Sequence, residues 1–353
     1  MSLAKIIQLK DAIINFFDRT DRLVYVAETN DWIVKWVGQH VVGELNRRGL
    51  MKSRVSLSSF GLKNKIIHYG SINSFLRNGL ENNKNGNKIV VSWYHVVPDD
   101  ERLRHIEAIN DRVDLVLTAC QTTKKELIMN GLKEDKIAVV ALGVDLNDFK
   151  ALPSGRRAEL RKRLGLPDDK IIIGSFQKDG NGWGEGLEPK LIKGPDVFCA
   201  AVIELAKKYP IEVLLTGPAR GYVKRRLQAA GVPYLHRIAD KQKDLADYYN
   251  CLDLYLIASR VEGGPESLSE SWATGVPVVS TRMGMPADFI IDGRNGMLAE
   301  VEDVDGLAKA ADKLLSDKIL REKIINQALV DVKKLGWDNL STEYYDKIYH
   351  KLS

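Results

Sequence analysis

Two glutamates, Glu262 and Glu270, flank a turn that contains two adjacent glycines. The apolar run 252–258 before the turn predicts a buried parallel strand, and the residues after it predict a helix that ends at Gly275. The turn therefore places backbone N–H groups at a helix N-terminus, where anions bind. Glu262 lies in the loop, and we expect Glu270 about two turns into the helix. One carboxylate can bind sugar hydroxyls, and the other can bind the two hydroxyls of a ribose. The backbone amides between them can bind a diphosphate.

This stretch resembles the E-x7-E motif of the retaining nucleotide-sugar glycosyltransferases of family 4, also called group 1 glycosyl transferases. The strand before the motif, the glycine pair inside it and the segment 275–281 after it match that family in order. The alternative interpretation is that Glu262 caps a helix and Glu270 is a solvated helix residue. The resemblance implies that Glu262 contacts the donor sugar and Glu270 the ribose. It assigns the rest of this donor contact to Gly264, Glu266, Ser267 and Leu268.

Lys193 and Gly194 resemble the Lys-Gly pair of the same family, in which the lysine neutralises the donor diphosphate. Relatives carry an arginine near the end of the preceding strand, where this chain has Gln177 and Lys178. We assign the second cationic role to Lys178. Cations are needed here because the leaving diphosphate gains negative charge as the glycosidic bond breaks. The alternative is that both lysines are ordinary surface residues.

His95 follows the predicted strand 88–93, and the resemblance places it near the donor sugar, where it could donate a hydrogen bond to a hydroxyl. A structural role for a lone histidine is the alternative. His68, at the end of another strand, is a second candidate. Arg237 and Ile238 are expected to border the base. The catalytic set is therefore Glu262, His95 and Lys193.

Metal chemistry has little support in the sequence. Asp303 and Asp305 form a D-x-D triplet, but it stands before an apolar helix, where helix capping is the better interpretation. The three cysteines are far apart and predict neither disulfides nor a zinc site. The expected reaction needs no metal and no cofactor. Its donor substrate is a UDP-, GDP- or ADP-sugar.

Strands alternate with helices in two series, which predicts two doubly wound, Rossmann-like α/β domains. We expect an acceptor-side domain at 1–150, a nucleotide-sugar domain at 151–335 and a C-terminal helix at 336–353. The resemblance implies that the domains face each other across a cleft (the GT-B fold) and that the last helix crosses back to the first domain. The expected strands are 23–27, 54–58, 66–69, 88–93, 115–119 and 137–140, then 171–176, 212–217, 252–258, 277–280 and 296–299.

The composition is that of a soluble globular protein: 353 residues, 44% of them hydrophobic and 28% charged, with a net charge of +5. Apolar residues at helical spacing predict an N-terminal helix within 1–22 and no signal peptide, so we expect a cytoplasmic protein. The basic run Arg156–Arg163 is interpreted as a solvated helix face. Its alternative is peripheral contact with an anionic membrane at the inner face, where a lipid-linked acceptor would lie. Nucleic-acid binding is disfavoured, because no aromatic residues interleave with these charges.

The predicted function is transfer of a sugar from a nucleotide donor to an acceptor hydroxyl with retention, in glycan, glycolipid or cell-surface polysaccharide synthesis. The acceptor is a glycan, a lipid-linked molecule or a small molecule. One alternative is a non-catalytic nucleotide-sugar-binding protein. Another is a related two-domain enzyme such as a nucleotide-sugar epimerase.

Overall fold

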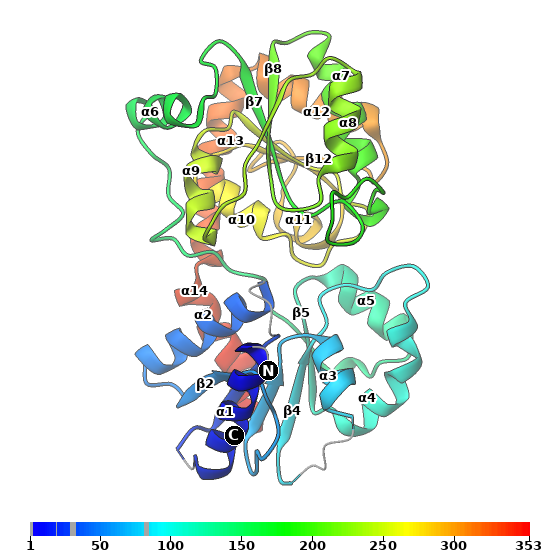
Figure 1. Ribbon diagram of the computed structural model, residues 1–353, viewed down its shortest axis with the longest axis vertical. Helices are drawn as coiled ribbons and strands as arrows, with labels where there is room; N and C mark the ends of the chain where they lie inside the picture. The colour runs from blue at the N-terminus through cyan, green and yellow to red at the C-terminus, as the bar shows by residue number, and fades with distance from the viewer. Residues whose placement is uncertain (1–2, 19, 29–32, 81–84) are drawn as a thin grey trace. The chain divides into compact units, whose positions relative to one another are not determined.

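The computed structural model describes residues 3–18, 20–28, 33–80 and 85–353. The chain divides into two compact units, each with its own parallel sheet (Figure 1). Unit 1 comprises Met1–Gly143 and Trp337–Ser353, and unit 2 comprises Val144–Gly336. The division precedes the expected boundary at residue 150 because Val144 already bridges Gly336 and donates its N–H to Leu335 at 2.9 Å.

Unit 1 is built on a six-stranded sheet in the order β2-β1-β3-β4-β5-β6, and all neighbouring strands are parallel. Strands β1, β3 and β5 are buried at every position, as expected when helices cover both faces of a sheet. The strands are β1 (Leu23–Val26), β2 (Ser53–Ser56), β3 (Ile66–Tyr69), β4 (Lys88–Ser92), β5 (Leu115–Thr118) and β6 (Ile137–Val139).

The helices of unit 1 come from both ends of the chain. They are α1 (Leu3–Phe17), α2 (Ile33–Arg47), α3 (Ile72–Asn78), α4 (Ile106–Arg112), α5 (Gln121–Met129) and α14 (Trp337–Tyr344). Helix α2 buries Val34, Val37, Val41 and Leu45, a spacing that places them on one face. The sequence predicts a helix from Trp32 to Arg48 here, and Trp32 lies outside the described residues.

The C-terminal segment returns to unit 1, where α14 packs on α2. The rings of His40 and Trp337 stack with centroids 5.3 Å apart. Further on, the Tyr349 hydroxyl lies 2.7 Å from Nδ1 of His68, which is buried in β3. The other ring nitrogen of His68 lies 2.8 Å from the Ser92 hydroxyl. His68 is therefore a core residue that ties the C-terminus to the sheet.

Unit 2 has a second six-stranded parallel sheet, in the order β12-β11-β10-β7-β8-β9. Counted within the unit, this is the strand order 3-2-1-4-5-6 of dinucleotide-binding folds. The direction of winding reverses between β7 and β10, which are neighbours. The strands are β7 (Ile171–Phe176), β8 (Ile211–Thr216), β9 (Tyr234–His236), β10 (Leu254–Ile257), β11 (Val278–Thr281) and β12 (Met297–Ala299).

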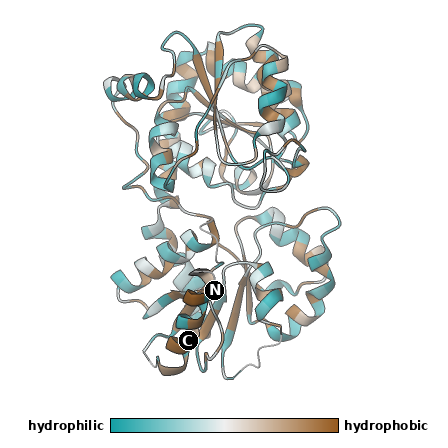
Figure 2. Ribbon diagram, in the orientation of Figure 1, coloured by the Kyte–Doolittle hydropathy of each residue, from teal (hydrophilic) through white to brown (hydrophobic). Residues whose placement is uncertain are grey.

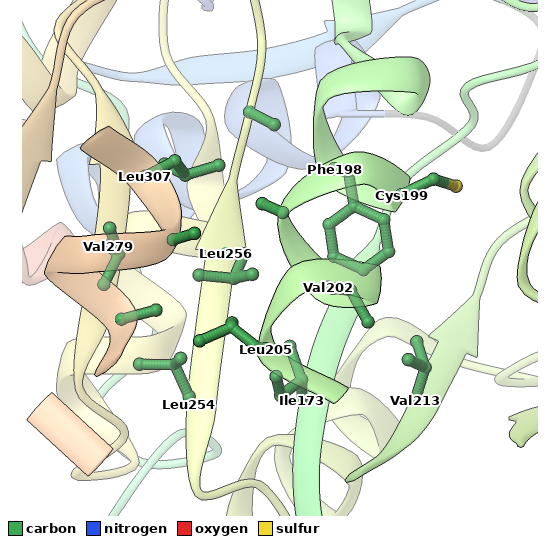
Figure 3. Close-up of a cluster of buried hydrophobic side chains, with 14 of the residues drawn as sticks. Ile173, Phe198, Cys199, Val202, Leu205, Val213, Leu254, Leu256, Val279 and Leu307 are labelled. Atoms are coloured by element: carbon green, nitrogen blue, oxygen red, sulfur yellow. The ribbon is translucent and has the colours of Figure 1, made fainter. Parts of the chain in front are cut away.

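The core of unit 2 lies between this sheet and two helices, α7 (Pro195–Ala206) and α12 (Val304–Ser316). Figure 3 shows Phe198, Val202 and Leu205 of α7 beside the strand residues they pack on. The remaining helices are α6 (Ser154–Leu164), α8 (Gly221–Ala229), α9 (Leu245–Asn250), α10 (Glu266–Ala273), α11 (Gly284–Phe289) and α13 (Lys318–Asp331).

Two arginines of the basic run in α6 bond to other parts of unit 2, whereas Arg156, Lys162 and Arg163 are exposed as predicted. Arg157 donates to the carbonyls of Asn250 and Leu252 at 2.8 and 2.5 Å. Arg161 donates to the Cys251 carbonyl at 2.9 Å and pairs with Asp253 at 2.8 Å. The face is therefore bonded to the segment between α9 and β10 and is not simply solvated. Membrane contact through this run stays a prediction.

The predicted fold class is confirmed, and all the expected strands are present. Strand β9 was not predicted, because its three half-buried residues form no apolar run. Helix α10 begins at Glu266, so Glu270 lies about one turn into the helix and not two.

We predict that His68 makes unit 1 sensitive to acid. Burial lowers the pKa of His68 from 6.5 to about 3, so the ring stays neutral in the folded protein while the unfolded chain takes up a proton. The free energy of unfolding should therefore fall as the pH drops from 6.5 toward 3, by at most about 1.4 kcal/mol per pH unit from this group. Urea unfolding across this range measures the slope. The His68→Gln variant should show a smaller slope, and an identical slope would contradict the assignment.

Candidate functional site

The site forms where the winding of the unit 2 sheet reverses. Ligands of open α/β sheets bind outside the carboxyl ends of the strands at this switch point. Here it lies between β7 and β10, whose following segments carry Lys178 and Glu262. The fold therefore brings together residues that are far apart in the sequence.

Backbone hydrogen bonds join the segment after β10 to the short 3₁₀ turn Leu191–Lys193 before α7. The N–H groups of Arg260 and Val261 both donate to the Ile192 carbonyl, at 2.9 and 3.1 Å. The Arg260 guanidinium adds two bonds of 2.8 Å to the carboxylate of Asp196 in the first turn of α7. Arg260 is thus a positioning residue for this turn.

This joining places Lys193 against Glu262, and the two side chains form an ion pair. Their side chains are 21% and 16% exposed, so solvent or a ligand can still reach the pair. Gly194 follows in the left-handed conformation, with φ of +59°, and a Cβ there would collide with the Ala258 carbonyl oxygen. The Lys-Gly pair therefore needs its glycine because the backbones approach closely at this point.

The Glu262 loop is supported from its other side by the start of α11. Met285 donates its N–H to the Gly263 carbonyl at 2.9 Å. Gly284 has φ of +52°, and a Cβ at this position would collide with the Glu262 carbonyl oxygen. Gly284 thus fixes the loop that carries the carboxylate.

Three lysines gather beside the single carboxylate of Glu262. Lys193 donates its N–H to the Lys190 carbonyl at 2.8 Å, and Lys190 donates its own to the Asp179 carbonyl at 2.7 Å, next to Lys178. Burial, and then the charges of Lys193 and Lys178, lower the pKa of Lys190. Among the residues that the structure describes, neither Lys178 nor Lys190 forms an ion pair with a carboxylate. The group carries an excess of positive charge and suits an anion.

Lys178 is held by an aromatic ring. Its ammonium lies 4.8 Å from the ring centroid of Trp183, a side chain that is 65% exposed. Trp183 belongs to the glycine-rich loop that returns to Lys190. This loop is anchored by the buried ion pair of Asp179 with Arg220, at 2.9 Å. Arg220 is fully buried at the base of this loop.

Helix α10 brings two further carboxyl groups to the site. The Gln242 amide donates to Glu266 and to Glu270, at 3.0 Å each. The Tyr249 hydroxyl donates to Glu270 at 2.8 Å. Burial raises the pKa of Glu270, and burial together with the charge of Glu270 raises that of Glu266. The two carboxyls share one amide donor in a poorly hydrated place, which favours holding a proton.

At the start of α10, the Leu268 amide that the sequence analysis assigns to the donor is already used within the chain. Pro265 precedes the helix, and the Leu268 N–H donates to the Pro265 carbonyl at 3.1 Å. The Glu266 and Ser267 amides stand in the first turn, where a helix offers no internal acceptor. Gly264 lies half-buried just before it.

The other predicted site residues lie farther along the sheet or in unit 1. Arg237 and Ile238 follow β9 and are exposed. His95 belongs to unit 1, after β4, and its carbonyl accepts bonds of 3.1 Å from Trp93 and from Arg102. Their roles toward a donor stay predictions. Over the described part of the chain, no group of three or more His, Cys, Asp or Glu side chains could hold a metal ion.

Sequence reasoning missed Lys190, Gln242, Tyr249 and Arg260. The K-x-x-K spacing of Lys190 and Lys193 was a usable signal. The other three contact the site only because the sheet brings together the 3₁₀ turn Gln242–Asp244, α9, α10 and the segment after β10.

Comparisons with known proteins address the same region. Residues 187–330 match the family model described as glycosyl transferases group 1. This match lies entirely within unit 2. The matched residues include Lys190, Lys193, Glu262, Glu266 and Glu270.

The curated relatives match only part of the chain. The chain is 29% identical over 247 residues to the D-inositol 3-phosphate glycosyltransferase of Xylanimonas cellulosilytica, covering 66% of this chain and 56% of that protein. The lipopolysaccharide core biosynthesis glycosyltransferase LpsE of Rhizobium meliloti is 32% identical over 156 residues, covering 44% and 43%. The chain thus spans about half the length of these curated relatives.

Solved structures support the fold. Anabaena HepE in complex with UDP-glucose superposes with a TM-score of 0.76 at 16% identity, covering 93% of this chain and 99% of that one. Sucrose-phosphate synthase from Thermosynechococcus elongatus gives 0.73 at 16% identity, covering 95% and 99%. At this identity the likeness establishes the fold alone. No helix among the described residues is long and apolar enough to cross a membrane.

We predict that Gly284→Ala disturbs the Glu262 loop. The new Cβ collides with the Glu262 carbonyl, and φ of +52° is strained for alanine, so the free energy of unfolding should fall by about 1–3 kcal/mol. Gly184→Ala is the matched control, because nothing lies within 4 Å of a Cβ there. Chemical denaturation measures both variants, and equal stability of the two would refute the bracing role of Gly284.

Proposed function

We propose that the protein is a glycosyltransferase that moves a sugar from a nucleoside diphosphate to an acceptor hydroxyl, with retention of anomeric configuration. The observation that carries this proposal is the lysine group beside Glu262, followed in the next helix by the half-buried Glu266 and the buried Glu270. Cations at one end and a hydrogen-bond acceptor at the other suit the diphosphate and ribose of one nucleotide. The matched family domain agrees with this chemistry.

The diphosphate is assigned to Lys178, Lys190 and Lys193, with the amides at the start of α10. Charge builds on the leaving phosphate as the glycosidic bond breaks, and fixed cations stabilise it there. An arriving phosphate competes with Glu262 for Lys193. The freed Glu262 carboxylate can then accept hydrogen bonds from hydroxyls of the donor sugar. The Lys193–Glu262 ion pair is thus replaced by a contact of Lys193 with phosphate and a contact of Glu262 with the sugar.

The ribose is assigned to Glu270, whose carboxylate can accept bonds from two adjacent hydroxyls. Tyr249 and Gln242 hold that carboxylate in place. Arg237 and Ile238 are assigned to the edge of the base.

For the chemical step, the nucleoside diphosphate leaves from the same face on which the acceptor hydroxyl attacks. The acceptor oxygen bonds to the anomeric carbon, the bond to the diphosphate oxygen breaks, and the leaving phosphate takes the acceptor proton. No protein base is needed. His95 is assigned a hydrogen bond to the donor sugar, and metal independence is part of the proposal.

UDP-glucose is the first donor to test, because the similar HepE structure contains it. Isothermal titration with UDP-, GDP- and ADP-glucose in the presence of EDTA compares the nucleotides without metal. NMR of the product reports the anomeric configuration. Donor binding without transfer or hydrolysis on any acceptor would favour a binding protein, and a changed free nucleotide-sugar would favour an epimerase.

We predict that Lys190→Met weakens UDP binding about tenfold or more, because a charge-assisted bond to a phosphate contributes roughly 1.5–3 kcal/mol. Uridine, which has no phosphate, should bind both proteins equally. Lys207→Met is the control, since Lys207 is exposed and pairs with Glu204 within α7 and the turn after it. Titration calorimetry gives the affinities. Unchanged UDP affinity in Lys190→Met would remove Lys190 from the site.

We predict that UDP affinity falls as the pH is lowered through the raised pKa of the Glu266–Glu270 pair, above the ordinary glutamate value of 4.5. The ribose hydroxyls need a carboxylate acceptor, so binding must expel the proton that the pair holds at lower pH. Calorimetry in buffers of different ionisation enthalpy counts the released proton. Glu270→Gln should bind more weakly and release fewer protons, since phosphate ionisation is common to both proteins. The same proton count in both would contradict the ribose role.

A further inference from the structure

Helix α1 is attached to unit 1 by its polar side. Asp11 accepts the Leu57 N–H at 2.6 Å. Asn15, only 4% exposed, donates to the Ser58 and Phe60 carbonyls at 2.9 and 2.8 Å and accepts a bond from Arg54. The inward stripe of α1 is therefore polar or small, the reverse of a typical surface helix.

The outward face of α1 is apolar. Seven of its side chains are between 37% and 79% exposed, and Phe17 is the most exposed. They are Ile6, Ile7, Leu9, Ile13, Ile14, Phe16 and Phe17. Phe60, itself 62% exposed, extends this face through an edge-to-face contact with Phe16 at 5.5 Å. We call these eight side chains the α1 apolar face; much of the α1 ribbon is brown in Figure 2.

The exposed charged side chains that the structure describes on α1 and directly after Phe60 are lysines. Lys5 and Lys10 on α1 and Lys63 after Phe60 are exposed. The acids turn inward: Asp11 binds a backbone amide, and Asp18 pairs with Arg54 at 3.4 Å. The outward surface thus combines exposed apolar side chains with lysines, as in helices that lie in the interface of anionic membranes.

We propose that the α1 apolar face docks on an anionic lipid surface. Exposed apolar patches of this kind mark interaction sites. A two-fold pairing of two copies through this face would set lysine rims of the same sign against each other, while acidic headgroups match them. The proposal rests on unit 1 alone and does not depend on the transferase reaction.

The test is co-sedimentation with vesicles of phosphatidylcholine alone and of equal parts phosphatidylcholine and phosphatidylglycerol. The full chain should bind the anionic vesicles more strongly. Ile13→Ser/Phe17→Ser should reduce the partition coefficient on the order of tenfold or more, since two apolar side chains stay in water. Met129→Ser/Ile319→Ser is the matched control, because these residues are 84% and 82% exposed on other helices.

Lys5→Glu/Lys10→Glu leaves the apolar side chains intact and should abolish the preference for anionic vesicles. Thermal unfolding of each variant verifies that it is folded. No binding by the parent chain, or equal binding by the parent and Ile13→Ser/Phe17→Ser, would overturn the proposal. Sedimentation velocity tests the other occupant. If the parent chain binds no lipid but forms a concentration-dependent dimer, and only Ile13→Ser/Phe17→Ser loses that dimer, the face binds a second copy of the chain.

Discussion

The site of unit 2 depends on one carbonyl. Ile192 accepts the N–H groups of both Arg260 and Val261, which fixes the turn before α7 to the segment after β10. That contact is possible because β7 and β10 are neighbours at the switch point and Gly194 has no side chain to separate the two backbones. Lys193 and Glu262 meet as its consequence. A backbone contact is less sensitive to side-chain substitution than an ion pair, so the scaffold can keep its geometry while the side chains serve a ligand.

The two ends of the site differ in their electrostatics. Near the turn, three lysines outnumber one carboxylate, so Glu262 offsets their mutual repulsion only in part. At α10, burial raises the pKa of two carboxyls that share the Gln242 amide. Binding of a phosphate would thus relieve an unfavourable arrangement at the lysines. Binding of a ribose at α10 would instead require the carboxyl pair to lose its proton first, which opposes binding at lower pH.

The sequence predicted the strands well because a strand covered on both faces must be a continuous apolar run. It missed β9, whose residues are only half-buried. The Glu262 and Glu270 positions followed from their spacing around a turn, whereas Gln242 and Arg260 act through contacts that only the strand order creates. Arg157 and Arg161 of α6 were misinterpreted as solvated for the same reason, while Arg156 and Arg163 are exposed as predicted. Their acceptors are carbonyls of a segment that is distant in the sequence.

Helix α1 shows why periodicity cannot reveal which face of a helix is buried. Its apolar spacing predicted a helix, and a helix is present, but the face toward the protein is polar.

The reason for this polar inner face lies in the part of the protein that it covers. Strand β2 is the edge of the sheet, and the chain after it, from Leu57 to Phe60, has backbone groups with no neighbouring strand. Buried backbone groups need hydrogen-bond partners, and Asp11 and Asn15 supply them. An apolar stripe turned inward would leave those groups unsatisfied. The cost of burying unpaired amides and carbonyls therefore outweighs the gain from burying isoleucines and phenylalanines, and it leaves those side chains exposed on the outer surface.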